Sequence, residues 1–144
     1  MKTTTITNSK LFQSIITVCI FSAFSIAQNT LSIEVGDGTI DVLYNSDADI
    51  GGFQFTVEGA AVTGGSGGDS AANGFMISCS STMCLGFSLT GGTIPAGNGV
   101  LVQVEIDGNA GAACISDAIL SDASGAAIHL SSPWNMVCPG VSGH

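Results

Sequence analysis

The sequence predicts an all-β domain, an antiparallel β-sandwich of jelly-roll type with about eight or nine strands. Apolar residues recur at every second position in most segments after residue 30, which is the period of a half-buried strand. Clusters of Gly, Asp, Asn and Pro interrupt these segments about every 8–12 residues, as turns do in sandwiches. Nothing beyond the first 27 residues has the period of an amphipathic helix, so strands must build the core.

The first segment, 1–27, has the pattern of a secretory signal peptide. Lys2 and Lys10 precede an apolar run, 11–26, and the small residues that end at Ala27 suit a signal peptidase. The run contains several Ser, Thr and Gln residues, so it is more polar than a typical membrane-spanning helix, and an uncleaved anchor is the alternative. We therefore expect a secreted protein, located in the extracellular space or at the cell surface.

The remaining chain divides into one sandwich domain, 28–130, and an irregular tail, 131–144. A glycine-rich segment, 64–74, has side chains too small to pack a core, and we expect it to form a flexible crossing between two parts of the sandwich, with a linker between domains as the alternative. The expected strands, in chain order, are 31–35, 40–44, 53–57, 75–79, 85–89, 100–106, 114–120 and 126–130.

The first two strands are expected to form a hairpin, because the three residues Gly36-Asp37-Gly38 join them. The third strand places Phe53 and Phe55 on one face and is the densest apolar element of the chain. In the sixth strand, Val100 is expected on the inward face together with the alternate residues that follow it.

Four cysteines follow the leader, which in an exported protein favours two disulfides. Cys79 and Cys84 have the spacing C-x4-C, and Cys114 and Cys138 stand alone, so a zinc site is the weaker alternative. We favour a bridge between Cys79 and Cys84, because two thiols close in sequence meet often. The second bridge then joins Cys114 to Cys138 and tethers the tail.

The pairing of the two strands that flank this first bridge depends on which side of each strand faces the core. Placing Cys79 opposite Leu85 sets Ile77 opposite Phe87 and keeps both apolar faces inward, with 80–84 as a loop. Placing Cys79 opposite Cys84 would turn the apolar side of the second strand away from the core. We therefore expect the first arrangement, with Phe87 in the core.

The charge is strongly acidic. The chain has 11 Asp and Glu residues, and its two basic side chains, Lys2 and Lys10, both lie in the leader. Nucleic-acid recognition relies on Lys and Arg to replace counterions, so we expect no nucleic-acid partner and no anionic membrane surface. The carboxylates are expected to be solvated, hydrogen-bonded or neutralised by an external cation.

An acidic loop precedes the aromatic strand. Asp47 and Asp49 have the alternate-residue spacing that opens an EF-hand, but Ile50 occupies the place of the turn glycine and Thr56 that of the closing glutamate, which excludes an EF-hand. A looser calcium site formed by Asp47, Asp49 and Asp122 is one hypothesis, since Ca²⁺ prefers oxygen ligands. The alternative is a solvated turn whose side chains bond nearby backbone.

Catalytic and sugar-binding residues are few. His129 and His144 are the two imidazoles, and we expect no enzyme activity. Sugar binding uses exposed aromatic rings, for which Tyr44 and Trp134 are the candidates, because the phenylalanines fit the core pattern. Packing is the alternative role for both rings.

Three segments resemble cohesin domains. The segment GDGTIDVLYNSDADIGGFQFTV (36–57) resembles their opening strands, LGFSLTGGTIPAGNGVLVQVEI (85–106) a later strand, loop and strand, and CISDAILSDASGAAI (114–128) their closing hairpin. The resemblance implies a sandwich that uses one sheet face to hold a partner domain. Many cohesins have a Y-D-P-x-x-L type stretch after the third strand; here Glu58-Gly59-Ala60 stands in its place, and the four cysteines are also additional.

The functional expectation is therefore a secreted, non-catalytic, cohesin-like module that associates with a dockerin-like protein in an extracellular or cell-surface assembly. A carbohydrate-binding module for a polysaccharide is the first alternative. A structural subunit of an extracellular matrix is the second.

Overall fold

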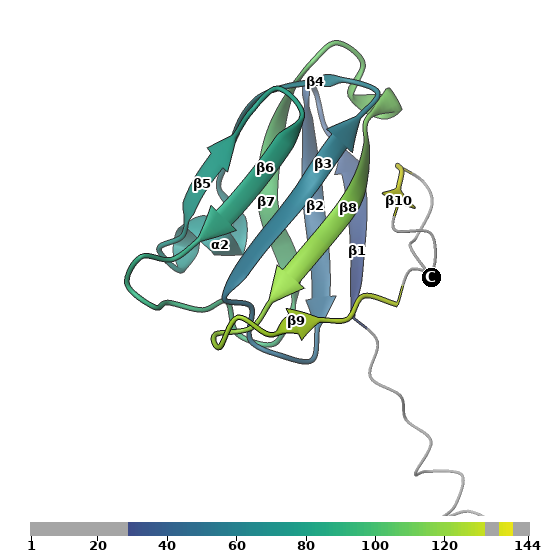
Figure 1. Ribbon diagram of the computed structural model, residues 1–144. Helices are drawn as coiled ribbons and strands as arrows, with labels where there is room; N and C mark the ends of the chain where they lie inside the picture. The colour runs from purple at the N-terminus through teal and green to yellow at the C-terminus, as the bar shows by residue number, and fades with distance from the viewer. Residues whose placement is uncertain (1–28, 132–135, 140–144) are drawn as a thin grey trace, which may run out of the picture.

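Two antiparallel sheets pack face to face in the computed structural model (Figure 1), which describes residues 29–131 and 136–139. The expected leader, 1–27, lies outside the described residues, as do Trp134 and His144. The predicted sandwich is confirmed, with ten strands in the described part of the chain rather than eight or nine. Each helix that the structure describes is too short or too polar to cross a membrane.

One sheet has four strands, and its outer edges are the first and fourth strands of the chain. In spatial order its strands are β1 (Thr30–Val35), β2 (Thr39–Ser46), β7 (Gly97–Asp107) and β4 (Ala61–Ser66).

The second sheet has six strands, and it faces the viewer in Figure 1. In spatial order its strands are β10 (Met136–Val137), β8 (Cys114–Ser121), β3 (Gly52–Glu58), β6 (Met83–Phe87) and β5 (Met76–Cys79), with β9 (Ala127–Ile128) paired to β8. The chain changes sheet after β2, β3, β4, β6 and β7, which produces the jelly-roll connectivity.

The expected hairpin of the first two strands is confirmed. Leu31 lies opposite Tyr44 and Val35 opposite Ile40, and the three predicted residues form the turn. The alternating apolar residues of both strands face the second sheet, as their period requires. β3 contributes Phe53 and Phe55, whose rings stack with centroids 6.0 Å apart at the centre of the core.

The strand pairing expected around the first disulfide is wrong. Cys79 lies directly opposite Cys84, and Ile77 lies opposite Gly86. Leu85 and Phe87 therefore point away from the core, and Phe87 is exposed. The apolar side of β6 is its outer side.

The reason for this orientation lies in β3. The Phe53 ring covers Gly86 so closely that a Cβ there would overlap it. The same ring stacks on Phe75, with centroids 6.3 Å apart. The space beneath β6 is thus filled by aromatic rings from β3 and from the residue before β5, and β6 contributes a glycine to it.

The glycine-rich segment 64–74 is not a structureless crossing. It contains the end of β4 and a five-residue helix, α2 (Gly68–Ala72). The buried hydroxyl of Ser70 donates to the carbonyl of Leu101 at 2.6 Å. Gly68 lies so close to β7 that a Cβ would be 2.6 Å from that carbonyl oxygen, and only glycine fits there.

β7 contains a bulge that the alternation did not predict. Val42 pairs with Val102 and Leu43 with Val100, so Leu101 is an extra residue between them. Leu101 is buried next to Val102, whereas Val100, expected inward, is only half-buried.

Both favoured disulfides are confirmed, Cys79–Cys84 and Cys114–Cys138. The tail was expected to be irregular, but Met136 and Val137 form β10 on the edge of β8. The second bridge closes this pairing at the residue after the strand.

Candidate functional site

Six large apolar side chains lie on the outward side of the six-stranded sheet. We call this surface the apolar face. Five of its side chains are strongly exposed, between 37% and 54% of their full area, and the sixth, Leu85, is half-buried. Its members are Met76, Met83, Leu85, Phe87, Ile119 and Met136.

The strand register arranges these side chains in three rows. Each row crosses the sheet through residues that lie opposite one another on neighbouring strands. Strands about 4.8 Å apart and outward residues about 6.7 Å apart give a face of roughly 19 by 13 Å. The rows are Met76, Phe87, Gly52, Ser121; Ser78, Leu85, Gln54, Ile119; and Met83, Thr56, Ser116, Met136.

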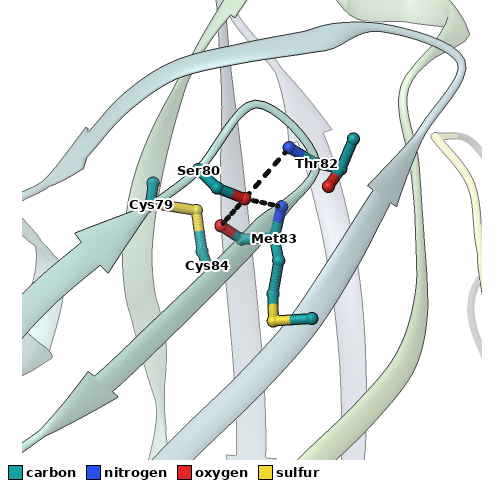
Figure 2. Close-up of a disulfide and its surroundings, with 5 residues drawn as sticks. All are labelled: Cys79, Ser80, Thr82, Met83 and Cys84. Carbon is teal, nitrogen blue, oxygen red and sulfur yellow. Dashed lines mark hydrogen bonds between the residues drawn. A yellow bond between two sulfur atoms is a disulfide. The ribbon is translucent and has the colours of Figure 1, made fainter.

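The hairpin of β5 and β6, which carries four of the six apolar residues, is held from below and at its turn. Figure 2 shows the Cys79–Cys84 bridge and the hydroxyl of Ser80, which accepts hydrogen bonds from the amides of Thr82 and Met83 at 3.3 and 3.1 Å. The turn carbonyl of Thr82 in addition accepts from the amide of Val57 at 2.7 Å. The hairpin is thereby fixed to β3, and its outer side chains are presented on a rigid support.

Beneath the hairpin, the bridge fills the space between the two sheets. Cys84 is fully buried, and a Cβ on Gly65 of β4 would lie 2.7 Å from Sγ of Cys79. The glycines of β4 therefore make room for the two sulfur atoms. A larger residue at Gly65 would push the hairpin away from β4.

Two carboxylates adjoin the three rows of the apolar face, Glu58 beyond the third row and Asp117 between the second and the third. Oε1 of Glu58 accepts a hydrogen bond of 2.6 Å from the hydroxyl of Ser116. Asp117 lies in a bulge of β8 opposite Phe55, where its backbone has a φ of 50° and its side chain is exposed. Left-handed backbone is tolerated by Asp better than by most residues. The residues of the three rows themselves carry no charge.

The outward side of the four-stranded sheet is acidic, in contrast to the apolar face. We call it the acidic face and define it by Glu34, Asp41 and Glu105. Glu34 lies directly opposite Asp41, and Asp41 accepts a hydrogen bond of 2.8 Å from the side chain of Gln103. Like charges placed opposite one another on neighbouring strands repel.

Two of the three carboxylates of the calcium hypothesis accept hydrogen bonds from backbone amides. Asp49 accepts from the amide of Ala96 at 2.9 Å, and Asp122 accepts from the amides of Ser124 and Ala126 at 2.9 and 3.0 Å. The Ser124 hydroxyl, together with these amides, lowers the pKa of the Asp122 carboxyl.

Asp47 uses its own amide to donate to the side chain of Asn29 at 2.8 Å. Among the described residues, no three His, Cys, Asp or Glu side chains are grouped as a metal site would need. The hydrogen bonds match the alternative of solvated turns, and calcium binding stays a prediction.

Tyr44 is not an exposed platform for a sugar. Its ring is only 5% exposed, and its hydroxyl donates to Oδ2 of Asp69 in α2 at 2.7 Å. Burial, and then the Asp69 carboxylate, raise the pKa of Tyr44 to about 12. Tyr44 therefore packs the core and links β2 to α2. Trp134, the second candidate, lies outside the described residues.

His129, the single imidazole that the structure describes, is exposed after β9. No cluster of metal-ligating side chains adjoins it within the described residues. The expectation of a non-enzymatic domain stays a prediction.

The apolar face was not recognised from the sequence, because Leu85 and Phe87 were assigned to the core, Met83 to the loop 80–84 and Met136 to the irregular tail. One signal pointed to it. Direct pairing of Cys79 with Cys84 fixes the outward direction of Leu85 and Phe87, and this pairing was rejected because it exposes an apolar strand face.

Comparisons with known proteins identify the fold. No family model matches the chain, and no curated protein sequence does. Among solved structures, a non-cellulosomal cohesin from the hyperthermophilic archaeon Archaeoglobus fulgidus matches with a TM-score of 0.53 and 13% identity, over 80% of this chain and 93% of that chain. The sixth cohesin of scaffoldin B from Acetivibrio cellulolyticus, solved in complex with a Cel5 dockerin mutant, matches with a TM-score of 0.53 and 15% identity, over 78% of this chain and 99% of that chain. The resemblance to cohesins is therefore confirmed for the fold.

Proposed function

We propose that this chain, which has the fold of a cohesin, is a secreted, non-catalytic module that binds another protein through its apolar face. The observation that carries the proposal is the exposure of five large apolar side chains on one sheet surface, with half-buried Leu85 among them. Large apolar side chains gathered on one exposed surface are typical of interaction sites. The leader pattern of 1–27 supports secretion.

The size and composition of the face suit the centre of a protein interface. A stable interface covers about 800 Å² on each partner, with an apolar core inside a polar rim. The apolar face, at roughly 19 by 13 Å, corresponds to such a core. Methionine and aromatic residues, of which the face has Phe87 and three methionines, are enriched in interface cores.

The partner is expected to present an apolar centre with Lys or Arg at its rim. This chain has 11 carboxylates, and outside the leader it has no Lys or Arg to pair with them. Two of the carboxylates adjoin the rows of the apolar face, Glu58 beyond the third row and Asp117 between the second and the third. A basic rim on the partner would complement them and increase the association rate at low salt.

Charge also argues against a second copy of this chain as the partner. Two copies docked through their apolar faces would bring two strongly acidic domains together without a cation between them. A dockerin-like domain is the occupant that we propose, because the cohesin of matching fold from Acetivibrio cellulolyticus is bound to a dockerin.

Affinity capture from the secretome of the source cells tests the proposal. The baits are the mature domain, the variant Ile119→Asp, and the control Val35→Asp, which places the same charge at a residue of similar exposure, 46% against 54%, on the other sheet. A charge at the centre of an interface core typically costs 2 kcal/mol or more, so we expect about 30-fold lower recovery of the partner with Ile119→Asp. Val35→Asp should recover as much as wild type.

Equal recovery by all three baits would contradict the proposal. Retention of the wild type on insoluble polysaccharide, abolished by Phe87→Ala, would instead support the carbohydrate-binding alternative, since Phe87 is the exposed ring on this face. Concentration-dependent self-assembly would support the matrix alternative.

A further inference from the structure

The methionines of this chain are not scattered. Of the four in the sequence, Met1 begins the leader, and the other three all lie on the apolar face. Met76, Met136 and Met83 are 52%, 44% and 37% exposed. Methionine is unbranched and polarizable, and it is more common in cores and adaptable binding surfaces than on ordinary protein surface.

Their positions enclose the face. Met83 and Met136 stand at the two ends of one row, with Thr56 and Ser116 between them. Met76 lies two rows away beside Phe87, about 13 Å along the strands. A partner seated on Leu85 and Ile119 would therefore contact thioethers on more than one side.

We propose that Met76, Met83 and Met136 form an oxidation site through which peroxide converts the apolar face into a polar one and releases the partner. The release step rests on the proposed function, whereas the oxidation itself does not.

The chemistry requires only hydrogen peroxide. A lone pair of the thioether sulfur attacks one peroxide oxygen, the O–O bond breaks, and the second oxygen leaves as water with both protons. The sulfur loses two electrons, the peroxide gains them, and the product is methionine sulfoxide. This product is polar, and methionine sulfoxide reductases can reverse it.

The other sulfur atoms of the described chain do not compete for the oxidant. All four cysteines are joined in the bridges Cys79–Cys84 and Cys114–Cys138, so no free thiol is present among them. Exposed thioethers are then the sites where a mild two-electron oxidant reacts first. The bridges also hold the sheet in place while its surface changes.

The test compares the mature domain with a variant that carries Met76→Leu, Met83→Leu and Met136→Leu, each before and after dilute hydrogen peroxide. Peptide mapping measures sulfoxide at each site, circular dichroism checks the fold, and a phenyl-substituted column measures surface hydrophobicity without any partner. We expect conversion at all three sites, fastest at Met76 and slowest at Met83, and earlier elution of the oxidised wild type. The elution position of the leucine variant should be the same before and after peroxide treatment.

Capture from the secretome supplies the second readout. Oxidised wild type should recover at least tenfold less partner than the untreated protein, and treatment with both stereospecific sulfoxide reductases should restore recovery. Absence of sulfoxide at these sites, unchanged elution despite oxidation, or an equal elution shift in the leucine variant would overturn the proposal. The proposal would also be overturned if oxidised and untreated wild type recovered equal amounts of a partner whose recovery Ile119→Asp abolishes. If Ile119→Asp leaves recovery intact, the proposed function fails, and the column still decides whether oxidation changes the face.

Discussion

The two outward faces of this sandwich are built on the same strand period but have opposite chemistry. On the four-stranded sheet, the outward positions carry Glu34, Asp41 and Glu105, which is the ordinary pattern of a solvated surface. On the six-stranded sheet, the outward positions of β5 and β6 carry Met76, Met83, Leu85 and Phe87. The difference shows that alternation reveals which residues share a face, whereas the direction of that face depends on what lies beneath it.

The largest loss of stability that we expect comes from a substitution on the inner side of β6. Gly86→Ala would force a Cβ into the Phe53 ring and should lower the free energy of unfolding by about 3 kcal/mol. The matched control is Gly52→Ala, since Gly52 lies opposite Phe87 on the outward side and a Cβ there would meet the Ser121 hydroxyl at 3.1 Å and the Gly86 carbonyl at an ordinary contact distance of 3.5 Å. Urea unfolding measures both. Equal destabilisation would mean that the inner and outer sides of these strands are not as described.

The next largest effect on stability is expected at Tyr44, whose side chain lies beneath the acidic face. Tyr44→Phe removes the hydrogen bond to Asp69 and should lower stability at neutral pH by about 1 kcal/mol. The pKa of Tyr44 rises from 10.0 to about 12 on folding. The unfolded chain therefore loses this proton first, and stability that is fully present below pH 10 is lost as the pH rises toward 12.

Alkaline unfolding of the mature domain isolates this effect unusually well. The chain has one tyrosine, its Lys residues lie in the leader, and the four later cysteines are bridged. Wild type should lose stability between pH 10 and 12, and Tyr44→Phe should show almost no pH dependence there. Parallel curves for the two proteins would contradict the assigned role of Tyr44.

A smaller effect on stability is expected from the repulsion between like charges on the acidic face. Glu34→Gln removes the repulsion with Asp41 directly opposite and should raise the free energy of unfolding by about 0.5 kcal/mol at low salt. In about 1 M salt the two proteins should unfold at the same urea concentration, because the repulsion is screened. A gain that persists in high salt would point to a cause other than charge.

The smallest effect concerns calcium. Asp49 and Asp122 already accept backbone hydrogen bonds in their turns, so we expect the Tm in calcium to match that in chelator within about 1 °C. An increase of several degrees, lost in a variant with Asp47→Asn, would establish the loose calcium site.

Much of the fold was predictable because local chemistry determined it. The hairpin of β1 and β2 follows from alternation and three turn residues, and β3 follows from Phe53 and Phe55. Both disulfides were expected, although spacing alone could not set the register between Cys79 and Cys84.

The remaining features depend on contacts between distant segments. β4 and α2 consist largely of small residues with weak intrinsic preferences, and they form because Gly65 and Gly68 allow close approach to the first bridge and to β7. The apolar face was missed in part because Leu85 and Phe87 were placed inside, as apolar residues usually are, whereas the register of β6 directs them outward. The sequence around Asp117 did not indicate the bulge that β8 forms there.

The positions of the disulfides also determine where this domain opens first. Cys79–Cys84 joins the two strands at one margin of the six-stranded sheet, and Cys114–Cys138 closes the pairing of β8 with β10 at the other. The margins of the four-stranded sheet, β1 and β4, have no such cross-link in the described chain. Fraying and amide hydrogen exchange should therefore begin at β1 and β4. Under mechanical load, the apolar face between the two bridges would be the last part of the described domain to lose its shape.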